Sequence, residues 1–261
     1  MSAATSPAIP PRLRWAREDI RHRVAVNAKD GSVLVHVPAG PFEMGDGGDS
    51  DCPKHAVELS AYWIGVHAVT NAQYGRFVAA TGHRRPETAD YGKAVWRNGS
   101  YPREKADHPV VCVSWDDAQA YVRWAGCVLP TEAQWEKAAR GPVGLIYPWG
   151  NAWDPSRCRN DGNRGDETTI AVSGYASGVS GYGTYQQSGN VWEWCSDRYD
   201  EDYYRSSSAR DPGGPSGGST RVSRGGCWWI DDPAYFRAAY RYGYSPGFRI
   251  DNLGFRLART A

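Results

Sequence analysis

The patterned part of the chain begins with short apolar runs that are separated by turns. One run covers residues 33–37 and stops before Pro38, a second covers 42–45, and residues 57–66 resume the same character. Short runs rich in β-branched and aromatic residues, bounded by proline and glycine, predict strands. We therefore expect the first part of the fold to be built from strands.

Three later segments carry apolar residues at helical spacing. The first and the third begin with a capping box, in which a threonine is followed three residues later by a glutamine. Each segment ends at a glycine, the residue that most readily takes the left-handed conformation after a helix. The predicted first and stop residues are Thr70 with Gly82, Ser114 with Gly126, and Thr131 with Gly141.

The pattern weakens outside these elements. Residues 83–107 read as a long inserted loop in which only Val95 and Trp96 hint at a strand. After the third helix the chain consists of turns and short strands, and the alternation in residues 189–194 predicts one buried strand. The regular structure is expected to be small compared with the loops.

The C-terminal stretch, residues 221–259, holds neither the helical nor the strand period for long, yet it is rich in aromatic residues. Rings with a polar tip set among small polar residues are typical of a recognition surface. We interpret the stretch as a largely irregular surface segment, with successive rings on one side of an extended chain. Ordinary packing of half-buried tyrosines is the alternative. The aromatic residues are Trp228, Trp229, Tyr235, Phe236, Tyr240, Tyr242, Tyr244 and Phe248.

Composition narrows the class of protein. The 261 residues carry a net charge of +1, which favours neither nucleic acid nor an anionic membrane as a partner. Neither an apolar signal peptide nor a membrane-spanning segment is evident, so the default expectation is a cytoplasmic protein, with surface display by another route left open. We expect an N-terminal tail or adaptor over 1–31 and one domain over 32–261, and we make no prediction of oligomeric state.

Metal-binding motifs are scarce. The six cysteines are scattered without a C-x-x-C pair, and the six histidines show no metal-ligand spacing. The acidic run with Asp46, Asp49 and Asp51 reads as a solvated loop. Cys227 reads as a small buried filler and not as a reactive thiol.

A series of ordered motifs places the chain near a known family. They include Phe42-Glu43-Met44-Gly45, Leu129-Pro130-Thr131-Glu132, Tyr147-Pro148-Trp149-Gly150, Gly189 to Trp194, Arg224-Gly225-Gly226 and Gly254-Phe255-Arg256. With these motifs, from about residue 33 to the end, the chain resembles the formylglycine-generating enzyme (sulfatase-modifying factor) family. The resemblance implies an α+β, C-type-lectin-like fold that is loop-rich, with little regular structure.

The resemblance also implies a test for enzymatic activity. The enzymes of the family use two cysteines, a short way after Arg-Gly-Gly, to bind copper and oxidise a substrate cysteine, because soft thiolates suit Cu(I). Here no cysteine follows Cys227, which directly follows the glycines, so no copper is expected. The H-x-x-x-H-x-E pattern of the iron-dependent sulfoxide synthases on this domain is also absent.

The C-terminal stretch is further similar to the variable region of diversity-generating-retroelement variable proteins, which bind ligands on this fold. The constant Gly, Trp and Arg residues of such a region are present. At most of the positions between them, the residue found here can be encoded by an Asn codon after mutation of its adenines. Trp229 is the exception. By this resemblance the ligand-binding residues are Trp229, Ile230, Asp231, Tyr235, Tyr240, Tyr242, Gly243, Tyr244, Ser245, Phe248, Ile250 and Asp251.

The same resemblance suggests a structural calcium site, with a buried, hydrogen-bonded glutamate as the equal alternative for Glu193. Its ligands would be Glu193, Gly189 and Val191, with Asn160 and Asp161 at a second site. Arg237, Arg241, Arg249 and Arg256 are expected to be structural, and Trp192, Trp194 and Trp228 to lie in the core.

These observations favour a non-enzymatic ligand-binding protein whose partner is a protein or another macromolecule. The alternative is a formylglycine-generating oxidase that acts on a substrate cysteine. A purely structural or regulatory module is the third possibility.

Overall fold

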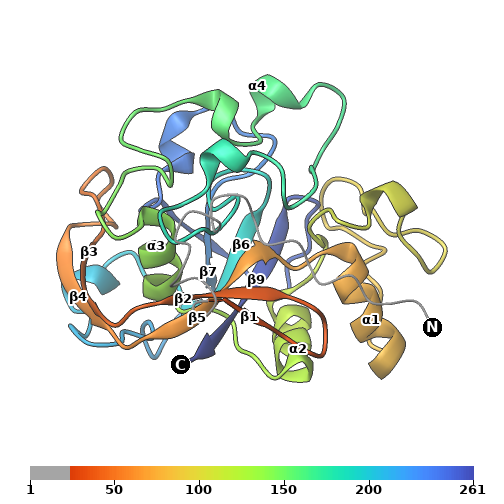
Figure 1. Ribbon diagram of the computed structural model, residues 1–261, viewed down its shortest axis with the longest axis horizontal. Helices are drawn as coiled ribbons and strands as arrows, with labels where there is room; N and C mark the ends of the chain where they lie inside the picture. Colours follow the sequence, from red (N-terminus) through yellow and green to blue (C-terminus); the bar gives the residue numbers. More distant parts are fainter. Residues whose placement is uncertain (1–23) are drawn as a thin grey trace.

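The computed structural model describes residues 24–261. A seven-stranded mixed sheet, in the order β1-β2-β5-β9-β6-β7-β8, runs through its centre, and a separate hairpin of β3 and β4 lies beside it (Figure 1). The strands are β1 (Val24–Val26), β2 (Val33–Val37), β3 (Gly40–Met44), β4 (His55–Leu59), β5 (Tyr62–Ala68), β6 (Trp192–Arg198), β7 (Arg221–Arg224), β8 (Arg241–Tyr244) and β9 (Leu253–Thr260).

The three predicted helices form at the predicted ends. They are α1 (Asn71–Thr81), α2 (Trp115–Ala125) and α3 (Glu132–Arg140), and the short α4 (Asp161–Arg164) follows in a loop. Each of the three is capped by the expected Thr or Ser hydroxyl, which accepts a hydrogen bond from the third helical N–H. A glycine with positive φ follows each last turn. The apolar spacing together with the capping and stop residues located these helices.

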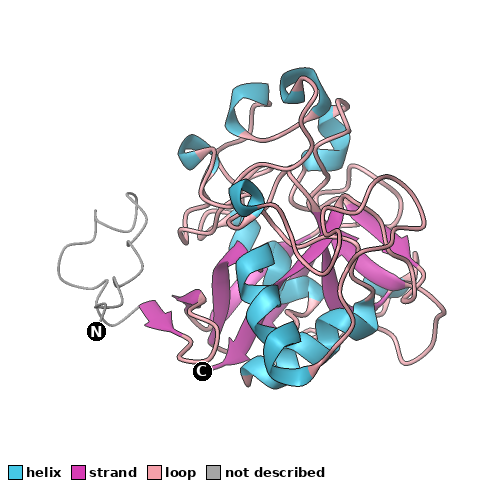
Figure 2. Cartoon of the chain, turned by 90° about the vertical axis from the view of Figure 1, so that its right-hand side faces the viewer, coloured by secondary structure: helices cyan, strands magenta, loops and turns pink. Residues whose placement is uncertain are grey.

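Loops occupy much of the molecule. Figure 2 shows the strands and the longer helices gathered in the lower half and a layer of loops with short helical turns above them. The 3-10 turns are Arg103–Lys105, Pro155–Arg157, Ala176–Gly178, Tyr203–Arg205 and Pro233–Phe236. The expectation of little regular structure is confirmed. Within residues 24–261, no helix is both long and apolar enough to cross a bilayer.

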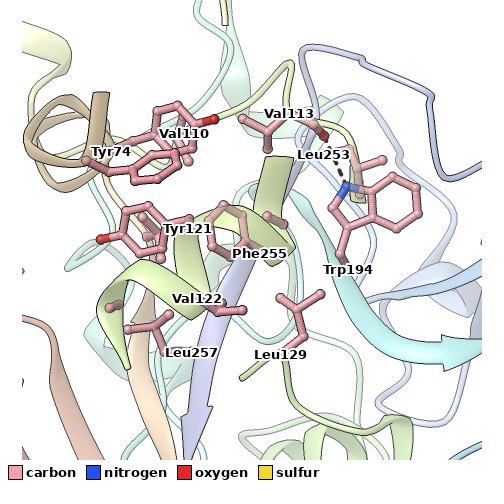
Figure 3. Close-up of a cluster of buried hydrophobic side chains, with 14 of the residues drawn as sticks. Tyr74, Val110, Val113, Tyr121, Val122, Leu129, Trp194, Leu253, Phe255 and Leu257 are labelled. Carbon is pink, nitrogen blue, oxygen red and sulfur yellow. Dashed lines mark hydrogen bonds between the residues drawn. The ribbon is translucent and has the colours of Figure 1, made fainter. Parts of the chain in front are cut away.

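The main core lies between the sheet and the pair of helices α1 and α2. Phe255 of β9 packs edge-on against Tyr121 of α2, with ring centroids 5.3 Å apart, and Tyr121 stacks on Tyr74 of α1 (Figure 3). Trp194 of β6 belongs to the same cluster, and its indole N–H donates to the carbonyl of Val113 at 3.1 Å. The predicted core positions of the tryptophans are confirmed.

Three expectations about strands need correction. Residues 24–31, which were assigned to the tail, include β1, which pairs with β2, and Asp30 is fully buried; residues 1–23 lie outside the described residues. Val95 and Trp96 form no strand; the indole of Trp96 is buried and donates to Asn71. The strand expected from residue 189 begins at Trp192, because Gly189 and Asn190 both have positive φ.

Candidate ligand-binding site

The C-terminal stretch is more regular than predicted, because β7 and β8 form a hairpin at the edge of the sheet. After β7, Gly225 and Gly226 take positive φ values of 102° and 71°. A Cβ on Gly226 would lie 3.0 Å from the carbonyl oxygen of Tyr235, so the chain can turn here only with glycine. This turn carries the chain from a buried strand to the exposed Trp229.

Strand alternation then separates the side chains of β8 onto two faces. Tyr242 and Tyr244 lie on the same face as Trp192 and Trp194 of β6, with ring centroids 5.7 Å (Tyr242 to Trp192) and 6.2 Å (Tyr244 to Trp194) apart. Gly243 lies on the opposite face, where an added Cβ would come within 2.9 Å of the ring of Tyr199. Packing against Tyr199 therefore explains the glycine at position 243, and its role as a contact residue stays a prediction.

The tyrosines of β8 belong to a continuous line of rings, which we call the aromatic row: Tyr235, Tyr240, Tyr242, Tyr244 and Phe248. Adjacent centroids lie 4.6 Å apart for Tyr235 and Tyr240, 4.8 Å for Tyr242 and Tyr244, and 5.4 Å for Tyr244 and Phe248. Buried Trp192 contacts both Tyr240 and Tyr242 and bridges the remaining step. The prediction that successive rings share one side is confirmed.

The aromatic row is partly accessible. Tyr242 is 40% exposed and the neighbouring Trp229 61% exposed, while the other four rings of the row are half-buried. Burial raises the pKa of Tyr240 and of Tyr244 well above the usual value, with the nearby Tyr235 adding to the effect at Tyr240 and Cys227 at Tyr244. Both hydroxyls stay protonated at neutral pH and can donate hydrogen bonds to a ligand.

The remaining predicted contact residues differ in their exposure to solvent. Asp231 and Ser245 are exposed, and Ile230 and Asp251 are half-buried. Ile250 is 5% exposed and packs in the main core, although it also lines the surface pocket beside Trp229 and Phe248, so its role as a contact residue stays a prediction. It points into the core because its carbonyl is paired with the N–H of Cys112, which holds this segment against the domain.

Behind β8, on the face opposite the aromatic row, lies a buried ion-pair network made of Glu132, Glu136, Arg224 and Arg241. The guanidinium of Arg241 donates to both oxygens of Glu132, at 2.8 and 3.0 Å. Arg224 pairs with Glu136 and lies 3.3 Å from Glu132. Burial alone would raise the pKa of Glu132, but Arg241 and Arg224 hold it below its usual value. All four side chains are almost fully buried and paired.

Arg224 also links this network to the aromatic row. Its guanidinium donates to the carbonyls of Ala238 and Ala239, at 2.8 and 2.9 Å, directly before Tyr240. Arg237 and Arg249, on the same stretch, pair with Asp46 and with Asp117. The structural role predicted for the arginines is confirmed.

The acidic run over 46–51 is exposed at residues 47–50, as expected of a solvated loop, but its three carboxylates have partners. Arg237 donates to both carboxylate oxygens of Asp46, at 2.6 and 2.7 Å, and also pairs with Asp49. Asp51 accepts a hydrogen bond from the hydroxyl of Tyr199 at 2.8 Å. The loop therefore supports the stretch that follows the Gly-Gly turn.

The geometry does not fit a calcium ion at Glu193. Its buried carboxylate accepts hydrogen bonds from the guanidinium of Arg256, at 2.5 and 2.7 Å, and from the indole of Trp135 at 2.7 Å. Arg256 already neutralises the charge that a cation would need. The structure instead matches the alternative of a buried, hydrogen-bonded glutamate, with Arg256 and Trp135 as its partners.

Of the other proposed metal ligands, the oxygens of Gly189 and Asp161 already have partners. The carbonyl of Gly189 accepts from the N–H of Val191 at 3.0 Å, and Asp161 pairs with Arg164 at 2.5 Å. The amide of Asn160 donates to the carbonyl of Cys158 at 3.0 Å. Calcium binding at Asn160 and Asp161 stays a prediction.

A copper site of the kind found in the family's enzymes does not fit either. All six cysteines lie within the described residues, are buried and form no disulfide. Burial raises the pKa of Cys227 and of Cys158 to about 12, so both are neutral thiols at neutral pH when no metal is bound. The stretch after Gly226 offers Cys227 as its single thiol.

The chain is similar to known proteins in sequence and in fold. The family model of the sulfatase-modifying factor enzyme 1-like domain matches residues 21–261. The chain belongs to this family. The formylglycine-generating enzyme of Streptomyces coelicolor is 37% identical, over 87% of this chain and 89% of its own length. A mouse protein named inactive C-alpha-formylglycine-generating enzyme 2 is 33% identical, over 92% of this chain and 89% of its own.

Among solved structures, Treponema denticola variable protein 1 superposes with a TM-score of 0.76 at 25% identity, covering 92% of this chain and 99% of its own. The predicted C-type-lectin-like α+β fold and the similarity to variable proteins are both confirmed. The sulfatase-modifying factor family includes proteins named as enzymes and others named as inactive, so membership alone does not decide the chemistry.

One contributor to the site was not found from the sequence. Tyr91, in the long loop over 83–107, is 72% exposed, and its ring centroid lies 5.8 Å from that of Phe248. A single bridge between Tyr91 and Ile250 brings the two segments together. A lone tyrosine in a polar loop carries no local signal for such a long-range contact.

Proposed function

We propose that this protein is a non-enzymatic ligand-binding member of its family, and that it contacts a protein or another macromolecule through the aromatic row and Trp229. The observation that carries the proposal is the continuous line of accessible rings, held from behind by buried ion pairs. Rings with few rotatable bonds lose little entropy on binding, and fixed supports reduce that cost further.

The chemistry of the thiols supports the same reading. Copper-dependent oxidation in this family needs two thiolates near the Arg-Gly-Gly motif, and this chain has only buried Cys227 there. The likeness to Treponema denticola variable protein 1 favours a C-terminal stretch in which contact residues vary within a constant fold.

A genetic test does not require the ligand to be known. We expect the DNA near the coding sequence to contain a near-identical repeat of the codons for residues 228–251 and a gene for a reverse transcriptase. Substitutions between independent isolates should fall on the aromatic row and its neighbours and spare Arg224, Arg241 and Arg256. Variation spread evenly over the chain would contradict the proposal.

A formylglycine-generating oxidase is the second candidate, because the Streptomyces coelicolor enzyme of that name is 37% identical. The purified chain would be supplied with Cu(I), oxygen and a cysteine-containing sulfatase peptide, and the peptide mass followed. We expect no conversion. Turnover that disappears in Cys227→Ser would establish the oxidase and end the binding proposal.

A further inference from the structure

A pocket of about 370 Å³ opens at the end of the aromatic row. Tyr91, Trp229, Phe248 and Tyr244 are among the residues that wall it. Tyr91 and Trp229 are the two most exposed aromatic side chains of the described residues, at 72% and 61%. Such exposure leaves ring faces open to a ligand and marks the pocket as a place where aromatic area is available for binding.

The rings meet at an angle and form a corner. Tyr91 and Phe248 lie 5.8 Å apart with their planes at 59°, whereas Phe248 and Tyr244 stack at 23° and form one continuous wall. A flat group such as a guanidinium makes its best contact by stacking parallel to one ring face. A corner of tilted rings instead suits a rounded group that can touch several ring faces at once.

A carboxylate completes the pocket. Asp251 is half-buried, and its Oδ2 accepts a hydrogen bond from the backbone N–H of Lys93 at 2.8 Å. In residues 24–261, no Lys or Arg side chain pairs with it, whereas nearby Asp117 pairs with two arginines, Arg84 and Arg249. A half-buried carboxylate without a cation partner is costly, and a cationic ligand would remove that cost.

The surrounding segments are acidic, although the chain as a whole carries a net charge of +1. Residues 90–93, 228–232 and 248–252 hold four acidic side chains against two basic ones. Their charge complements a cation and not an anion. The acidic residues are Asp90, Asp231, Asp232 and Asp251, and the basic ones are Lys93 and Arg249.

We propose that this pocket binds a methylated ammonium group, with Tyr91, Trp229 and Phe248 contacting its methyl groups and Asp251 facing its charge. The inference rests on the proposed binding function, since it identifies the chemical group that the ligand presents there. Ring faces attract cations electrostatically, and a methylated ammonium is rounded, weakly hydrated and without the N–H fork of a guanidinium.

Nuclear magnetic resonance of the tryptophan indoles in the full chain tests the inference. Trp229→Phe identifies the Trp229 signal, and the chain is then titrated with choline and with a short peptide that contains trimethyllysine. We expect both to shift this signal with saturation. The neutral isostere 3,3-dimethylbutanol should bind at least tenfold more weakly, and an arginine peptide should bind more weakly than the trimethyllysine peptide.

Two variants and a control sharpen the test. Asp251→Asn and Trp229→Leu should each weaken choline binding at least fivefold. Trp229→Leu changes an exposed side chain, so folding is not at issue, and its binding is followed by the indole signal of Trp228, which also lines the pocket. Val143→Ala changes an exposed apolar side chain that neither belongs to the aromatic row nor lines the pocket, and it should leave choline binding unchanged. A stronger response to the peptide than to choline assigns the group to a protein, and the reverse assigns it to a small molecule or headgroup.

Equal binding of 3,3-dimethylbutanol, tighter binding of the arginine peptide, or an unaffected Asp251→Asn would each overturn the inference. None of these outcomes would contradict the proposed binding function, provided that substitutions between isolates still fall on the aromatic row. Copper-dependent turnover of a cysteine peptide, with choline binding unchanged, would overturn the proposed function and not the chemistry of the pocket.

Discussion

Strand β8 has two faces that differ in composition and in solvent exposure. On one face, Tyr242 and Tyr244 contribute to a line of rings that is partly open to solvent. On the other, Arg241 is buried and held by Glu132 through two hydrogen bonds. Adjacent residues thus serve separate purposes, and we expect the buried ion pairs to contribute most to fixing the strand. The most exposed side chains of the open face can then be exchanged at small cost in stability.

Removing a partner from the buried face should have the largest effect. Glu132→Ala leaves the guanidinium of Arg241 buried without its carboxylate and takes one partner from Arg224. Breaking a buried pair in this way costs about 3–5 kcal/mol of unfolding free energy, to be measured by denaturant titration.

Glu58→Ala is the matched control, because Glu58 pairs with Arg210 at the surface, where both side chains are more than half exposed. We expect it to cost less than about 1 kcal/mol. Similar losses for the two variants would show that the network does not hold β8.

The buried face should also govern the dependence of stability on pH. Burial raises the pKa of Asp197, with Glu132 nearby adding to the effect, from 3.8 to about 7. A carboxyl group whose pKa is higher in the folded chain contributes its full stability when protonated, and that contribution is lost as the pH rises from about 4 to about 7. In Asp197→Asn this loss should be absent.

The unfolding free energy of Asp197→Asn minus that of the wild type should therefore increase by roughly 2–4 kcal/mol between about pH 4 and pH 8. The exposed Asp116→Asn serves as the control. A difference for Asp197→Asn that stays constant with pH would show that the carboxyl titrates as it does in the unfolded chain.

The same contrast explains which parts of the fold were predictable. Helix ends are local, so Thr70, Ser114 and Thr131 could be assigned as caps from the few residues that follow each of them. Strand β9 was not predicted, although Leu253, Phe255 and Leu257 alternate with polar or small residues, because the parallel pairing with β6 joins segments far apart in the sequence.

The candidate site was predictable to a similar extent. Its aromatic composition was visible in the sequence, whereas the inward turn of Ile250 and the contribution of Tyr91 depend on pairing with loops more than a hundred residues away. The arginine partner of Glu193 was equally hidden, because Arg256 approaches from β9. The residue types of the stretch were enough to predict a ligand-recognition surface. Which individual residues face the solvent could be seen only from the tertiary contacts.

On the open face, a more deeply buried side chain should lose more unfolding free energy when it is replaced by alanine. Tyr244 is half-buried against Trp194 and Phe248, whereas Tyr242 is 40% exposed. Tyr244→Ala should lower the unfolding free energy by roughly 2 kcal/mol, and Tyr242→Ala by less than about 1 kcal/mol. Equal losses, measured by thermal unfolding of both variants, would mean that Tyr242 is packed as tightly as its neighbour.

Trp229 should show the smallest change in stability. Its indole is 61% exposed after the Gly-Gly turn, so Trp229→Ala removes little buried area and should shift the unfolding free energy by less than about 0.5 kcal/mol. Its loss should nevertheless impair binding, because a central aromatic anchor contributes more to an interface than to the isolated fold. Val143→Ala, at another exposed apolar position, is the control for both measurements. If Trp229→Ala unfolds at a markedly lower denaturant concentration, the ring of Trp229 contributes to the stability of the fold. Trp229 would then have to be counted with the buried supporting residues and not with the exposed contact residues.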